Sequence, residues 1–116
     1  MNNTPIKTAS ILIVFTALPD AQSARALADA LVAERLAACV TVLPTAQSVY
    51  RWQNSIEHAT ETPLMIKTTA AHYAAVEAAL RARHPYATPE IIALPVTHGL
   101  PDYLAWVDAA TQPKDA

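Results

Sequence analysis

The chain has 116 residues, of which 53% are hydrophobic and only 16% are charged, and its net charge is −2. A chain of this length suits one domain, and its apolar composition excludes a disordered protein. A single glycine excludes a glycine-rich phosphate loop, and the slightly negative charge gives no basic field that would hold nucleic acid or an anionic membrane. We therefore expect one globular domain with neither nucleic acid nor membrane as its partner.

The first half of the chain predicts a strand, a helix and a long hairpin. After a flexible leader over residues 1–9, the apolar run from 10 to 16 favours a buried strand. Asp20 can cap a helix whose apolar spacing continues to residue 37. Residues 39–52, interrupted by Pro44, and residues 55–69 predict two opposed arms with Asn54 in the turn. Such a hairpin is longer than the usual strand of about 5–6 residues.

The second half repeats the helix and strand pattern. Residues 70–83 predict a second helix, residues 90–96 another strand, and Pro101 the start of a short C-terminal helix, with a frayed tail over residues 111–116. The order predicts a single α+β domain over residues 10–110, a ferredoxin-like β-α-β-β-α-β sandwich. Its two helices cover one sheet face and leave the other without cover, and the projecting hairpin invites pairing with another copy, so we expect a homo-oligomer.

Cysteine usage and the N-terminal sequence bear on location. Cys39 is the one cysteine and cannot form an internal disulfide, which favours a reducing compartment. The first ten residues lack the apolar segment of a signal peptide, and the apolar run that follows is far shorter than the roughly 20 residues that cross a bilayer. We therefore expect a cytoplasmic protein.

Five segments together resemble one known family, the CutA divalent-cation tolerance family. They are ERLAACV, SVYRWQNSIE, ETPLMIKTT, HPYATPEI and PVTHGLPDYLAW, and their order and spacing agree with that family over nearly the whole chain. The resemblance implies a tight homotrimer joined through its long hairpins, in the cytoplasm, linked to tolerance of copper and other divalent ions. It implies no enzymatic reaction and no required cofactor, with copper or another divalent cation bound weakly.

His84 and Cys39 are the candidate metal ligands. The resemblance implies copper ligands at a cysteine near the end of the first strand and at a histidine pair, but this chain has Phe15 and Arg83 at two of those positions. Histidine and cysteine are common ligands of divalent and soft metals. A copper(I) role for Cys39 would need a second soft ligand, for which Met65 is the only other mid-chain sulfur. The alternatives are a helix-terminal histidine bonded to local carbonyls and a small buried cysteine.

A second candidate site is a polar cleft between subunits. The resemblance places near such a cleft a set of aromatic and charged residues, namely Trp52, Glu61, Lys67, Tyr86 and Glu90. Opposite charges in a partly buried cleft suit either a small-ligand site in a signalling trimer or an ion-pair network that fixes subunit register. The sequence contains no Gly-x-Ser-x-Gly or His-Glu-x-x-His motif, so we expect a protein that is not an enzyme; a reaction in the cleft is the least favoured alternative.

Overall fold

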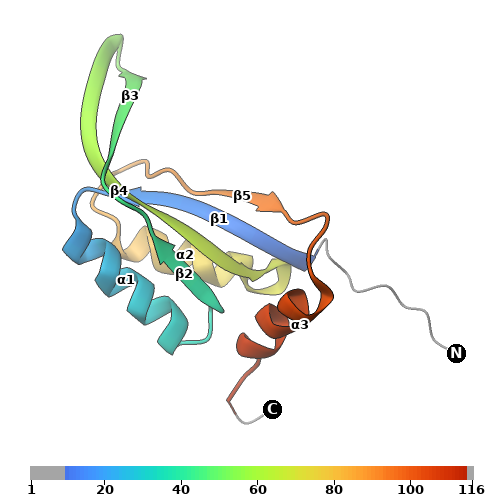
Figure 1. Ribbon diagram of the computed structural model, residues 1–116. Helices are drawn as coiled ribbons and strands as arrows, with labels where there is room; N and C mark the ends of the chain where they lie inside the picture. Colours follow the sequence, from blue (N-terminus) through green and yellow to red (C-terminus); the bar gives the residue numbers. More distant parts are fainter. Residues whose placement is uncertain (1–9, 115–116) are drawn as a thin grey trace, which may run out of the picture.

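The computed structural model describes residues 10–114, and the predictions for residues 1–9 and 115–116 lie outside them. The elements are β1 (Ile11–Leu18), α1 (Ala21–Ala33), β2 (Cys39–Val42), β3 (Ala46–Trp52), β4 (Ser55–Thr69), α2 (Tyr73–Arg83), β5 (Ile92–Pro95) and α3 (Pro101–Ala110) (Figure 1). A 3-10 turn, Ala70–His72, precedes α2. This order is the predicted one.

The sheet is antiparallel, with strand order β2-β4-β1-β5 and with β3 paired to the outer part of β4. This is the topology of a ferredoxin-like sandwich, and it confirms the predicted α+β class. The first seven residues of β4, from Ser55 to Glu61, pair only with β3. The hairpin therefore projects beyond the sheet at the end opposite α3 (Figure 1), and the longest dimension of the molecule reaches 59 Å.

The main core lies between the sheet and helices α1 and α2. Strand residues alternate between the two sheet faces, so every second residue of β1 and β4 points to the helices. The most deeply buried members are at most 2% exposed: Val14, Leu18, Leu27, Leu31, Leu64, Ile66, Val76 and Leu80. Because these side chains fill the helix-covered face of the sheet, the opposite face is the open one.

Helix α1 is shorter than predicted, because it ends at Ala33 and not at residue 37. The N–H of Arg35 donates to the carbonyl of Val32, and that of Leu36 to the carbonyl of Leu31, each at 3.0 Å. This pairing is a Schellman motif, in which the residue after the cap adopts the left-handed region. Arg35 does so with φ 60°, and because glycine usually fills this position, the sequence carried no stop signal.

The face expected to lack cover is in fact covered at one end by α3. Ile11 and Ala38 form a second small core with Leu104 and Val107. The rest of this open face carries apolar side chains that are half-buried or exposed: Ile13, Phe15, Met65, Ile92 and Leu94. We call these five residues the open apolar face.

The tail predicted to fray from residue 111 begins with a buried side chain. Thr111 is 1% exposed, and its hydroxyl donates to the carbonyls of Val107 at 3.1 Å and Asp108 at 2.9 Å. A hydroxyl that bonds back to the last turn satisfies carbonyls that a helix end leaves free. Fraying at Thr111 is therefore not what the structure shows.

Candidate functional site

A cavity of about 670 Å³ lies along the inner face of the hairpin, between it and the loop that follows α2. It is lined by Ala17, Ser48, Val49, Tyr50, Trp52, Glu61, Tyr86, Ala87, Thr88 and Glu90. Four of the five residues predicted for a cleft, Trp52, Glu61, Tyr86 and Glu90, thus line one cavity. We call it the hairpin groove.

Lys67, the fifth predicted cleft residue, does not line the hairpin groove. It follows Glu61 by six residues on β4, which is roughly 20 Å of strand. Its ammonium donates to the hydroxyl of Thr41 at 2.8 Å and lies 4.0 Å from the thiol sulfur of Cys39. Within one chain, Lys67 therefore belongs to a separate polar cluster on the open side of the sheet, and its place in a cleft between subunits stays a prediction.

Glu61 and Tyr86 form the buried polar end of the groove. Glu61 is only 9% exposed, and it lines the groove together with Tyr86. Burial raises the pKa of Tyr86 above its usual value near 10, and its interaction with the negative carboxylate of Glu61 raises the pKa further. Tyr86 therefore stays a neutral donor at neutral pH.

His84 fastens the loop that carries Tyr86 to the end of β1. Its Nε2 donates to the carbonyl of Ala17 at 2.6 Å, and its Nδ1 accepts from the backbone N–H of Tyr86 at 3.3 Å. The imidazole is 8% exposed and lies 4.8 Å from the Tyr86 ring, centre to centre. Both nitrogens are thus engaged with backbone groups, which matches the structural alternative for this histidine.

Arg83, beside His84, points to the other helix. Its guanidinium lies 3.7 Å from the carboxylate of Glu34, and both side chains are about half exposed. Exposed ion pairs of this kind contribute little to stability. Arg83 therefore takes no part in the hairpin groove.

The two predicted metal ligands do not meet within one chain. Residues 10–114 contain no group of three or more His, Cys, Asp or Glu side chains that could hold a metal ion. Cys39 lies opposite Lys67 of β4. His84 bonds to the carbonyl of Ala17, which lies opposite Pro63 of the same strand. Pro63 and Lys67 are four residues apart, which is about 13 Å along β4. The ammonium beside Cys39 also opposes a cation there. The described residues of one chain therefore form no copper centre with three or more of these ligands.

Sequence reasoning missed Ser48, Tyr50 and Thr88 as groove residues. Ser48 and Tyr50 were findable in principle, because side chains two apart on a strand share a face, and both share the face of Trp52. Thr88 lies in a loop, where no such periodicity exists.

No helix in the described part of the chain is long and apolar enough to cross a membrane.

The fold and its projecting hairpin match proteins of known structure. CutA from Xylella fastidiosa is 48% identical with a TM-score of 0.86, and the match covers 89% of this chain and 99% of that one. A protein described as the periplasmic divalent cation tolerance protein CutA, from Archaeoglobus fulgidus, is 32% identical with a TM-score of 0.85, over 88% and 99% of the two chains.

Sequence comparison gives the same kind of relative as the structural comparison. The divalent-cation tolerance protein CutA of Escherichia coli K12 is 46% identical over 103 residues, which is 89% of this chain and 91% of that one. These likenesses define the class as divalent-cation tolerance proteins. The sequence pattern described as CutA1 divalent ion tolerance protein matches residues 12–110, so the chain belongs to the CutA1 family.

Proposed function

We propose that this protein acts as a homotrimer in cellular tolerance to divalent cations, copper in particular. The observation that carries the assembly is the open apolar face, on which Ile92 and Leu94 are 54% and 53% exposed. Large contiguous apolar surfaces on a small protein mark interaction sites. The resemblance to the CutA family supports three copies.

The hairpin supplies the second argument for assembly. Its two strands pair only with each other over Ser55–Glu61 of β4, so each has an unpaired backbone edge. Val49 and Ile56 are 64% and 60% exposed on it. Such an edge is a template for strand pairing with another chain, and projection beyond the sheet makes it accessible.

We propose a non-enzymatic role, with no nucleic-acid or membrane partner and no required cofactor. The family is defined by divalent ion tolerance and not by a catalysed reaction. The net charge of −2 supports the absence of a nucleic-acid partner, and the single cysteine supports a cytoplasmic location. Because one relative is described as periplasmic, cell fractionation with a periplasmic marker is the test of that location.

Copper binding in this proposal is weak and uses soft sulfur ligands on the open side of the sheet. Cys39 pairs with Lys67, and Met65 lies two residues away on the same face of β4. Diagonal neighbours of this kind are about 7–8 Å apart, within reach of long side chains. Thiolate and thioether favour copper(I), but two ligands are fewer than the three or four of a tight site.

A copper(I) titration against a competing chelator tests this role. We expect weak binding that Cys39→Ala abolishes and Met65→Leu, which keeps the side-chain volume, reduces. The control is His98→Ala, since that imidazole is exposed and hydrogen-bonds to the neighbouring Thr97 hydroxyl. Tight binding that survives Cys39→Ala would contradict the assignment.

A second candidate function is favoured by the hairpin groove: a signalling trimer that binds a small ligand. A cavity of about 670 Å³ is within the size range of ligand pockets, and four predicted residues line it. A ligand that binds only the folded protein raises its thermal stability, so thermal shifts against small molecules are the first screen.

A further inference from the structure

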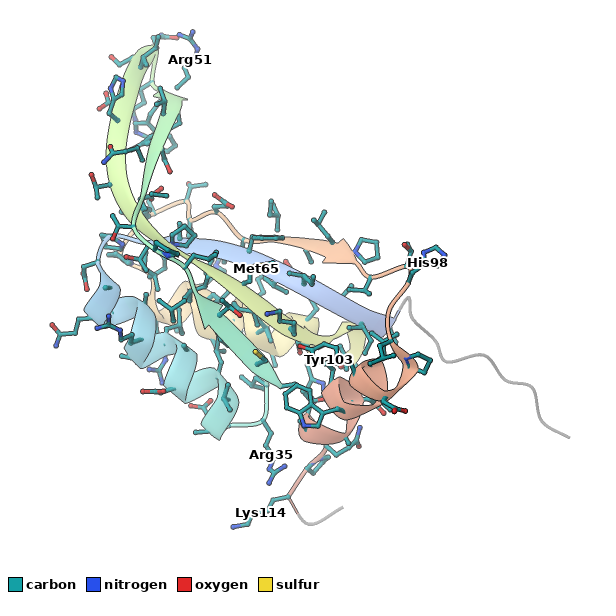
Figure 2. All side chains as sticks on the ribbon, viewed as in Figure 1. Arg35, Arg51, Met65, His98, Tyr103 and Lys114 are labelled. Carbon is teal, nitrogen blue, oxygen red and sulfur yellow. The ribbon has the colours of Figure 1, made fainter. Side chains whose placement is uncertain are left out.

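The hairpin groove has a charge arrangement that specifies its ligand. Side chains opposite each other in an antiparallel pair share a face, so Trp52, Tyr50, Glu57 and Glu61 all lie on one face of the hairpin. The two basic side chains of the hairpin, Arg51 and His58, lie on the other face by the same alternation. Figure 2 shows Arg51 at the tip, away from the loop that closes the groove.

No basic side chain lines the groove within residues 10–114. Glu61 is more than nine-tenths buried there, and the neutral phenol of Tyr86 lines the same groove. Glu90 adds a second, exposed carboxylate to the lining. A buried carboxylate is costly unless a cation or several donors meet it, so a ligand with cationic N–H donors complements Glu61.

The aromatic walls suit the rest of such a ligand. Tyr50 and Trp52 are 44% and 48% exposed, and Tyr86 is 39% exposed, although large rings normally bury more. Aromatic faces attract ammonium groups and pack against methylene chains. The groove is also long, because Trp52 lies six residues along β3 from Ala46, the partner of Glu61, or roughly 20 Å.

We propose that the hairpin groove binds an extended organic polycation, an aliphatic polyamine, with ammonium groups at Glu61 and Glu90 and its methylene chain against Tyr50 and Trp52. This inference rests on the ligand-binding role proposed for the groove. It is independent of copper binding, whose candidate ligands lie elsewhere on the sheet.

The test is calorimetric titration of the assembled full-length protein with spermidine. We expect saturable binding that Glu61→Gln weakens about tenfold or more, as loss of a charged hydrogen bond does. Asp29→Asn, an exposed change on α1 with the same effect on net charge, leaves the affinity unchanged. Octane-1,8-diol, which has a similar chain without charge, does not bind.

Glu90→Gln is the second variant, because this exposed side chain can be changed even if Glu61→Gln fails to fold; it lowers the affinity severalfold. The inference is overturned if spermidine does not bind, if Asp29→Asn weakens binding as much as Glu61→Gln, or if Mg²⁺ displaces spermidine at equal concentration. A thermal shift with another ligand but none with spermidine would leave the groove a ligand site and remove only the polyamine.

Discussion

Replacing His84 with alanine is expected to lower the free energy of unfolding by about 3 kcal/mol and to leave copper binding unchanged. The change removes the donor to the carbonyl of Ala17 and the acceptor of the Tyr86 N–H, and it empties a site that is 8% exposed. Each unsatisfied buried backbone group costs about 1–3 kcal/mol. Urea unfolding at one fixed protein concentration measures the loss.

The matched control for His84 is again His98→Ala, for which we expect a change of less than about 0.5 kcal/mol because the imidazole is exposed. The same two variants enter the copper(I) titration. If His84→Ala left stability unchanged and abolished copper binding, His84 would be a metal ligand and the structural role given to it here would be wrong.

Replacing Leu94 with glutamate is expected to convert the assembly into monomers at micromolar concentration. Leu94 lies on the edge strand β5 opposite Ile13 and is 53% exposed on the open apolar face. In a trimer joined through this face, the change would bury three unpaired carboxylates, each of which costs several kcal/mol. Light scattering coupled to size exclusion measures the mass.

Val32→Glu is the matched control for Leu94. Val32 lies on α1 and is 43% exposed. Its replacement by glutamate therefore introduces the same charge away from the open apolar face. Circular dichroism shows whether both variants keep their secondary structure. Dissociation by Val32→Glu but not by Leu94→Glu would mean that the copies meet through another surface.

The fold was largely predictable because its signals are local. The interruption at Pro44 and the turn at Asn54 were both found, and Asn54 has φ 67° in the turn, as such a short hairpin needs. The miss at the end of α1 came from Arg35, a residue that gives no warning of a left-handed conformation. The burial of Thr111 depends on contacts made after α3 has docked, which no pattern in the tail shows.

The site was predictable only in part, because register decides it. Glu61 and Lys67 share a face of β4, so sequence alternation alone cannot separate them. The structure separates them because the neighbours differ: Ala46 of the hairpin lies beside Glu61 and Cys39 of β2 beside Lys67. Strand pairing is a long-range property, and the prediction had no means to place it.

Sedimentation equilibrium of the unaltered protein at micromolar concentration tests the central claim most directly. A trimer joined through the open apolar face and the hairpin predicts three times the mass of one chain, independent of concentration across that range. The mass of a single chain would contradict the account, because the open apolar face and the hairpin would then be exposed to solvent and would join no copies.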